Sequence, residues 1–430
     1  MRFNKIIIPY FIFFIAIIMT IFNSGYEVHF SNLDGKYLIK SIEFYEFGEW
    51  SFFKRGPIYT LLISIGFYLF GVNFEIAIWI SLIFYIGSII LLYFISKDIF
   101  NEWVGLFSSL YALLSIPLFK ASFDIDPGSI MSFFVLFSIF LYLQYLKKQN
   151  YLNLFFSSFF LGIAMLTKEA ALFFIIYPIV LSIFIKEYKK YKKIFFELFY
   201  FYIIFFITLL PWLIFIFLND KNPILIFGEF LPSGGANIGL YTNDGFINFV
   251  YMVIFKGIPK TIYTLFKYEP FFILAILGVI LSFYKLIIGE KEHKTYIALI
   301  VVTLPVFAAY GIYLDGYRQL ISQLLILYIS IGYISYFFIK LNYVYIILGV
   351  ILISISIVTT YIINFDKLKN YNIKNIINER ITGKLGIEIN STGRMNNEIL
   401  VLSKWINNNI SFDNTSLLVG GVYDDTIKYL

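Results

Sequence analysis

The segment Ser31-Asn32-Leu33-Asp34-Gly35-Lys36-Tyr37 lies in the first polar stretch of the chain, Phe22 to Pro57. An apolar run, Ile6 to Ile21, precedes this stretch, and a second one, Pro57 to Val72, follows it. Ionisable residues are concentrated here in a chain of 430 residues of which only 14% are charged. The pattern predicts a polar site that an apolar protein holds at one of its faces.

The composition is typical of a membrane protein. Hydrophobic residues make up 60% of the chain, and a soluble domain would carry roughly 25% charge. Long apolar runs recur from end to end and are continuous rather than alternating, which predicts an all-α polytopic membrane protein and not a β-barrel. The net charge of +6 does not indicate nucleic-acid binding, because the basic residues cluster in short loops between apolar runs. Cysteine is absent, which excludes disulfides and thiolate metal sites.

Twelve apolar segments are candidate spans: Ile6–Phe22, Pro57–Val72, Glu75–Ile95, Trp103–Phe119, Gly128–Leu146, Tyr151–Leu166, Ala170–Ile185, Ile194–Leu218, Pro270–Ile288, Tyr296–Leu314, Gln319–Ile339 and Tyr343–Ile363. The most basic loop, Lys186–Lys193, is placed in the cytoplasm by the positive-inside rule. When the spans are counted from this loop back to the N-terminus, there is one span too many for the N-terminus to be in the cytoplasm as well. Pro57–Val72 is the weakest span, since a helix of that length reaches only about 24 Å across a core of roughly 30 Å. We therefore expect about 11 transmembrane helices, with outer-face juxtamembrane helices beside them.

This topology predicts a transmembrane domain, residues 1–363, and an extracytoplasmic C-terminal segment, residues 364–430. The N-terminus is expected in the cytoplasm, and the outer face of the cell (plasma) membrane receives the loops 22–57 and 219–269 together with the C-terminus. The C-terminal segment has a soluble composition, a helical apolar pattern at Glu398–Asn407 and a strand pattern at Ser416–Gly421. These patterns predict a small α/β unit.

Acidic residues on the predicted outer face are candidates for catalysis. Asp34 is the first, with a solvated loop residue as the alternative. Asp124 and Asp126 stand one residue apart before an apolar run and can present carboxylates to one cation or one donor group. Asp126-Pro127 also fits a helix N-cap followed by proline. A hard divalent cation such as Mg or Mn needs several oxygen ligands, so a metal would draw on Asp34, Asp124 and Asp126 together, and no cofactor is certain.

Basic residues on the same face are candidates for binding a phosphate group. Lys54 and Arg55 precede Gly56-Pro57, and the glycine would let backbone approach the phosphate; the alternative is an interfacial anchor. Lys168-Glu169 interrupts an apolar sequence, where ionisable residues are costly and usually functional; the alternative is a mutual ion pair at a turn. Arg318, beside Asp315, offers the same choice between a phosphate ligand and a local ion pair.

The order of these features resembles the C-type membrane glycosyltransferases, in particular the branch of protein O-mannosyltransferases and lipid A aminoarabinose transferases. The loop with Asp34 looks like the family's catalytic-acid loop, and Asp126 matches its second-loop aspartate. Arg55-Gly56-Pro57-Ile58-Tyr59 looks like its basic–Pro–Leu–Tyr motif, and Leu161–Lys168 is similar to its run ending in Thr-Lys. The helix from Arg318 resembles the span that places an arginine by the phosphate. Gly35 departs from the family, which often has a second acid there.

The resemblance implies an inverting glycosyltransferase that moves a hexosyl or pentosyl unit from a polyprenyl or dolichyl phosphate to a protein, lipid or glycan acceptor. It implies catalytic roles for Asp34 and Asp126, and phosphate binding by Lys54, Arg55, Lys168 and Arg318. Asp124, Glu169 and Tyr59 are candidates for contacts with donor, acceptor or metal. Membrane lipids are the remaining partners expected.

Two other functions fit a polytopic protein. A transporter of lipid-linked saccharides would favour ionisable groups in mid-span and repeated halves, whereas here these groups crowd one face. A polysaccharide polymerase or ligase should have a large outer loop rich in Arg and His, and Asn219–Glu269 contains neither.

Overall fold

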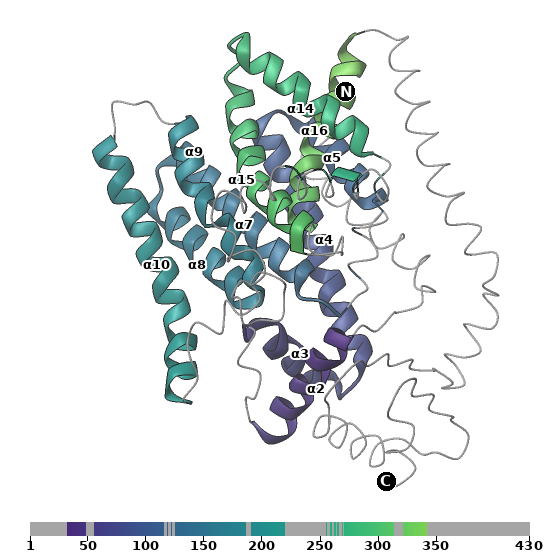
Figure 1. Ribbon diagram of the computed structural model, residues 1–430, viewed down its shortest axis with the longest axis vertical. Helices are drawn as coiled ribbons and strands as arrows, with labels where there is room; N and C mark the ends of the chain where they lie inside the picture. Colours follow the sequence, from purple (N-terminus) through teal and green to yellow (C-terminus); the bar gives the residue numbers. More distant parts are fainter. Residues whose placement is uncertain are drawn as a thin grey trace, which may run out of the picture.

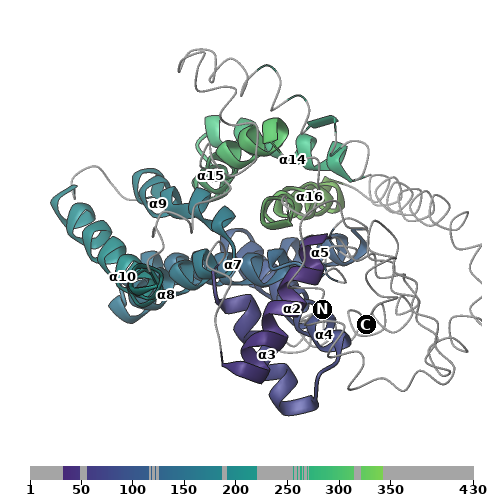
Figure 2. The same cartoon turned by 60° about the horizontal axis from the view of Figure 1, so that its bottom comes forward.

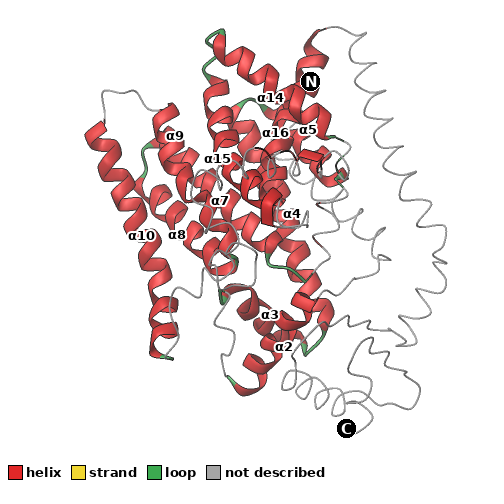
Figure 3. Ribbon diagram, viewed as in Figure 1, coloured by secondary structure: helices red, strands yellow, loops and turns green. Residues whose placement is uncertain are grey.

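The computed structural model shows a helical bundle (Figure 1). It describes residues 32–48, 56–115, 118, 122, 125–185, 191–219, 255, 259, 262–263, 265, 269, 271–313 and 321–341, with backbone alone at 32–36, 74, 191, 305–313, 321, 339 and 341. Every regular element in this part of the chain is a helix (Figure 3). The helical class predicted from the sequence is therefore confirmed for the described residues. The expected spans Ile6–Phe22 and Tyr343–Ile363 and the α/β segment lie outside them.

The elements follow one another along the chain with short connections. They are α2 (Asn32–Phe47), α3 (Ile58–Phe70), α4 (Phe74–Ile99), α5 (Glu102–Leu114), α7 (Gly128–Lys148), α8 (Tyr151–Thr167), the 3₁₀ helix η1 (Glu169–Ile176), α9 (Tyr177–Ile185), α10 (Tyr191–Leu218), α14 (Phe272–Ile287), α15 (Glu292–Tyr313) and α16 (Ile321–Leu341).

Asparagine residues fix where three of these helices begin. The side chain of Asn73 accepts the N–H of Glu75, and those of Asn101 and Asn150 do the same for the second residue after each. Such a cap satisfies a backbone donor that the helix cannot satisfy itself. The sharp turns between α3 and α4, α4 and α5, and α7 and α8 follow from these caps.

Three described helices are long and apolar enough to cross a bilayer: Glu75–Ile99, Gly128–Lys148 and Lys192–Leu218. Shorter apolar helices fill most of the other predicted spans, so the number of spans stays a prediction. One expected span differs clearly, because Ala170–Ile185 is divided into η1 and the short α9. The first outer loop also differs, since its residues 32–47 form helix α2.

The bundle has two chemically different ends. Its lysine-rich end holds the described lysines at the last turns of α4, α7, α14 and α16 and the first turns of α10 and α15: Lys97, Lys147, Lys148, Lys192, Lys193, Lys285, Lys294 and Lys340. The opposite end, here the α2–α3 end, carries α2 and α3, which lie side by side in both views (Figures 1 and 2). This separation agrees with the loop-by-loop charge pattern from which the topology was predicted.

Candidate active site

A buried ion pair joins α7 and α8 at the α2–α3 end. Lys168 Nζ donates to both carboxylate oxygens of Asp126, at 3.0 and 3.2 Å. The side chain of Lys168 is only 3% exposed and that of Asp126 12%. Two of the residues predicted from the sequence, 42 positions apart, are therefore in direct contact. The sequence analysis considered Glu169 as the partner of Lys168 in an ion pair at a turn. The structure shows that Asp126 is a partner of Lys168.

The local backbone explains how each partner reaches the pair. Asp126 Oδ1 accepts the N–H of Gly128 at 2.7 Å, so the predicted cap of α7 is present together with the ion pair. Lys168 has an extended backbone, with φ −154° and ψ 132°, between the end of α8 and the start of η1. The interruption between α8 and η1 changes the direction of the chain at Lys168. Glu169, the next residue, is buried as well.

Gly56 brings the start of α3 against the last turn of α8. A Cβ on Gly56 would overlap the backbone carbonyl of Leu166, so glycine is required for this contact. The structure thus shows a close contact of the Gly56 backbone with α8, and the predicted approach of Gly56 to a phosphate stays a prediction. Leu166 lies two residues before Lys168, and Arg55 directly precedes Gly56 in the chain. The described part of the predicted motif, Gly56–Tyr59, thus begins against the last turn of α8, and Lys54 and Arg55 are outside the described residues.

Helix α2 is packed on α3 by an aromatic contact and a hydrogen bond. The rings of Tyr37 and Tyr59 lie 5.1 Å apart edge to face, and Ser64 Oγ donates to the carbonyl of Ser41 at 2.9 Å. Ile125, the residue before Asp126, belongs to the same apolar cluster as Tyr37 and Tyr59. Asp34 is the third residue of α2, one turn before Tyr37. Its backbone is thus on an element packed near the ion pair; its side chain is outside the description.

Tyr59, a predicted candidate for a ligand contact, lies in the core of the α2–α3 end. It is fully buried, and its hydroxyl lies 3.3 Å from Ser81 Oγ on α4. This tyrosine joins α2, α3 and α4. Its described contacts are therefore those of a core residue.

Helix α16 reaches the same end through a pair of hydroxyls. Ser132 Oγ, on the second turn of α7, lies 2.8 Å from Ser322 Oγ near the start of α16. Small polar residues of this kind let membrane helices pack closely and hydrogen-bond across the interface. Arg318 precedes Ser322 by four residues and, like Asp124, is outside the described part of the chain.

A metal ion finds little support at Asp126. One of its oxygens is engaged by Gly128 N–H and both by Lys168. Within the residues that the structure describes, no group of three or more His, Asp or Glu is suitably placed to hold a metal.

Glu269 is a buried acid that the sequence analysis treated only as the end of a loop. One carboxylate oxygen accepts the hydroxyl of Ser115 at 2.6 Å, and the other accepts the N–H of Phe271 at 3.3 Å. Glu269 is 2% exposed. It fastens the start of α14 to the end of α5, from which the chain continues toward Asp126. An acid beside an apolar run, here before Pro270, was the available signal.

Part of the chain matches a known protein family. Residues 54–215 match the family model described as dolichyl-phosphate-mannose-protein mannosyltransferase. The matched range contains the Asp126–Lys168 pair and the Gly56 contact, while Asp34 and Arg318 lie outside it. No curated protein matches the chain by sequence.

Solved structures extend the match to most of the chain. The ArnT structure from Cupriavidus metallidurans bound to undecaprenyl phosphate superposes with a TM-score of 0.60 at 13% identity, over 86% of this chain and 66% of that one. The oligosaccharyltransferase from Archaeoglobus fulgidus in its apo form gives a TM-score of 0.58 at 11% identity, over 84% of this chain and 55% of that one. The chain has the fold of the C-type membrane glycosyltransferases.

The C-type fold confirms the resemblance drawn from the order of motifs. The chain spans less than two thirds of each of these two structures. Another structure of the archaeal protein, AglB, holds an inhibitory peptide and a dolichol-phosphate, and covers 93% of this chain at a TM-score of 0.57. The ligands in these solved structures are thus a lipid phosphate in ArnT and a lipid phosphate with a peptide in AglB, and a further structure of the Archaeoglobus fulgidus oligosaccharyltransferase holds Zn and sulfate.

Proposed function

We propose that this protein transfers a sugar from a polyprenyl-type phosphate to an acceptor on the extracytoplasmic face of the plasma membrane. The observation that supports the proposal best is the buried Asp126–Lys168 pair beside the α3 start. Burying two ions costs several kcal/mol each before their attraction offsets it. Ionisable groups retained at such a place in a membrane protein are usually functional.

The reaction we propose is a direct displacement with inversion. The acceptor hydroxyl or amide attacks the anomeric carbon, the bond from that carbon to the phosphate oxygen breaks, and the lipid phosphate leaves with the electron pair. Asp34 takes the acceptor's proton or orients the acceptor, which requires hydrogen-bond reach. The proposal covers both hexosyl and pentosyl donors, and the acceptor assay below identifies the sugar.

The leaving phosphate carries the largest change in charge, and basic side chains stabilise it. We assign this role to Lys168, Arg55 and Arg318, with Lys54 beside them. Such groups act strongly because they are already oriented in a site of low dielectric constant. Asp126, through its bonds to Lys168 and Gly128, fits a positioning role: it holds the lysine at the bend after α8. Glu169 and Asp124 remain candidates for contacts with donor or acceptor.

The test uses the purified chain, a labelled polyprenyl-phosphate sugar and a panel of peptide, lipid and glycan acceptors. Asp34→Asn keeps the shape of the side chain and removes the base. We expect transfer to fall by about 10²–10⁴-fold, which is typical of a lost general base. Asp98→Asn, at the lysine-rich end, is the matched control and should transfer at the parental rate. Equal rates for Asp34→Asn and the parent would overturn the assignment of Asp34.

A further inference from the structure

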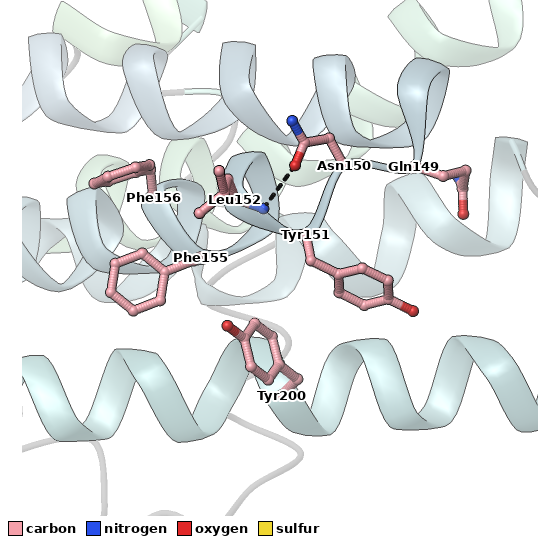
Figure 4. A pocket seen from close by; sticks show the side chains of 7 residues that line it. All are labelled: Gln149, Asn150, Tyr151, Leu152, Phe155, Phe156 and Tyr200. Carbon is pink, nitrogen blue, oxygen red and sulfur yellow. Dashed lines mark hydrogen bonds between the residues drawn. The ribbon is translucent and has the colours of Figure 1, made fainter.

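A hollow opens between the first turns of α8 and the facing side of α10, at the lysine-rich end. Its volume is about 550 Å³, within the range of roughly 300–1,000 Å³ that small ligands occupy. Figure 4 shows Tyr200 projecting from α10 toward Tyr151, with Phe155 and Phe156 farther along α8. The lining residues are Gln149, Asn150, Tyr151, Leu152, Phe155, Phe156 and Tyr200. We call this cavity the α8–α10 hollow.

The walls of the α8–α10 hollow are aromatic and open to the bilayer. The side chains of Tyr151, Leu152, Phe156 and Tyr200 are all exposed. The two rings nearest its mouth, Tyr151 and Tyr200, pack edge to face at 6.3 Å. Aromatic residues of this kind gather where the hydrocarbon core meets the headgroups. An acyl chain lying among them would cover apolar surface that is otherwise exposed.

Lys193 contacts a residue that lines the hollow, and two further exposed lysines adjoin it or the lining in the chain. Lys193 Nζ donates to Gln149 Oε1 at 3.0 Å, and half of its side-chain surface remains exposed. Lys193 and Tyr200, seven residues apart, share one face of α10. Lys148 directly precedes Gln149, and Lys192 precedes Lys193; both are exposed. Glu197, 3.8 Å from Lys193, is buried at 2% exposure and offers little opposing charge at the surface.

We propose that the α8–α10 hollow binds an anionic glycerophospholipid of the bilayer, with an acyl chain against Phe155, Phe156 and Tyr200 and the phosphate at Lys193 and Lys148. Basic pockets between helices on the cytoplasmic side bind such headgroups. A zwitterionic lipid would fill the apolar walls but bring no net negative charge to the exposed part of Lys193. The site is separate from the proposed active site, because α8 runs about 25 Å between the hollow and Lys168.

The absence of cysteine from the chain allows a direct test. Phe156→Cys places the one thiol at the hollow, where it is labelled with an environment-sensitive fluorophore. The labelled full chain is reconstituted in phosphatidylcholine vesicles with rising fractions of phosphatidylglycerol whose acyl chains are brominated. We expect quenching to saturate at a low fraction of brominated phosphatidylglycerol, and brominated phosphatidylcholine to quench only in proportion to its abundance. Phe217→Cys, on the exposed far end of α10, is the control and should show no preference.

A charge variant identifies the headgroup contact. Lys148→Gln with Lys193→Gln should weaken the preference for phosphatidylglycerol by about 30-fold, since each lysine near a membrane surface contributes about fivefold. Lys291→Gln with Lys294→Gln removes the same charge from another loop of this end and should leave the preference unchanged. Equal quenching by both lipids in the labelled Phe156→Cys protein, or equal loss in both double variants, overturns the proposal. The comparison of the two lipids in the labelled Phe156→Cys protein tests the proposal even if a double variant does not fold.

Discussion

Two ion pairs at opposite ends of the bundle are of very different kinds. At the α2–α3 end, Asp126 and Lys168 come from distant parts of the chain and are almost wholly buried, at 3.0 Å. At the lysine-rich end, Lys285 and Glu290 are five residues apart and closer, at 2.6 Å, but their side chains are 24% and 44% exposed. The shorter distance therefore belongs to the pair that water screens.

The difference shows that burial, more than number of charges or distance, indicates where a membrane protein uses its ions. Lysines are far more numerous at the lysine-rich end, where they agree with the predicted topology. An exposed pair contributes about 0–1 kcal/mol, whereas each buried ion costs several kcal/mol to desolvate. A fold that bears this cost at the α2–α3 end has a reason beyond stability, which we propose is to bind the donor phosphate.

Breaking the buried pair should have the largest effect. Asp126→Ala leaves Lys168 buried without this carboxylate and removes the cap of α7, so we expect the free energy of unfolding to fall by about 3–5 kcal/mol. The double variant Asp126→Asn with Lys168→Met keeps the capping oxygen and removes both charges. It should unfold near the parental midpoint in detergent, yet transfer sugar at least tenfold more slowly. A double variant that is stable and fully active would mean that the pair is purely structural.

Gly56→Ala tests whether the contact between α3 and α8 positions the site. The added Cβ would overlap the Leu166 carbonyl, so α3 must move, at a cost of roughly 1–3 kcal/mol. Because Arg55 is attached to the displaced residue, we expect transfer to fall with stability. Gly289→Ala is the matched control at the lysine-rich end: its φ of +98° makes alanine unfavourable, but no atom lies within 4 Å. The Gly289→Ala variant should lose roughly 1–2 kcal/mol of unfolding free energy and transfer sugar at the parental rate.

Glu269 tests the joint between α5 and α14. Glu269→Ala leaves the Ser115 hydroxyl and the Phe271 N–H without this acceptor, which should cost about 1–3 kcal/mol. Glu269→Gln keeps one acceptor oxygen and should cost about 1 kcal/mol or less. A double-mutant cycle with Ser115→Ala, measured by equilibrium unfolding, isolates the pairwise energy. Equal losses in the Ala and Gln variants would show that the carboxylate oxygens do not form this joint.

The sequence predicts most helices because long apolar runs have few alternatives in a bilayer. Gly128–Leu146 and Ile194–Leu218 differ from α7 and α10 by at most three residues at either end. Prediction from the sequence fails where a break in a helix depends on tertiary contacts. Ala170–Ile185 is uniformly apolar, so its division into η1 and α9 has no signal in hydropathy. Helix α2 was missed because its residues are too polar for a span, while its apolar face is defined only by packing on α3.

The candidate site was likewise predicted only in part from the sequence. Rarity within an apolar chain was enough to select Asp126 and Lys168, and the structure brings them together. Their pairing follows from a crossing of α7 and α8 that no local pattern encodes. The contact of Gly56 with Leu166 was not predicted, since a sequence shows that a glycine permits close approach but not what approaches it. Arg318 and the side chain of Asp34 remain predictions that the variants above address.

Lys285→Gln should have the smallest effect, and it tests the comparison from the lysine-rich end. The hydrogen bond from Lys285 holds the pKa of Glu290 below its usual range. A carboxyl whose pKa is lowered on folding adds stability above the unfolded pKa and loses it as the pH falls through the folded pKa. The lysine should therefore matter near neutral pH, by less than about 1 kcal/mol because both groups are solvated, and not at all in strong acid. Unfolding midpoints of parent and variant should accordingly differ slightly at pH 7 and converge below pH of about 4. A loss at pH 7 as large as that of Asp126→Ala would show that exposure does not separate the two pairs.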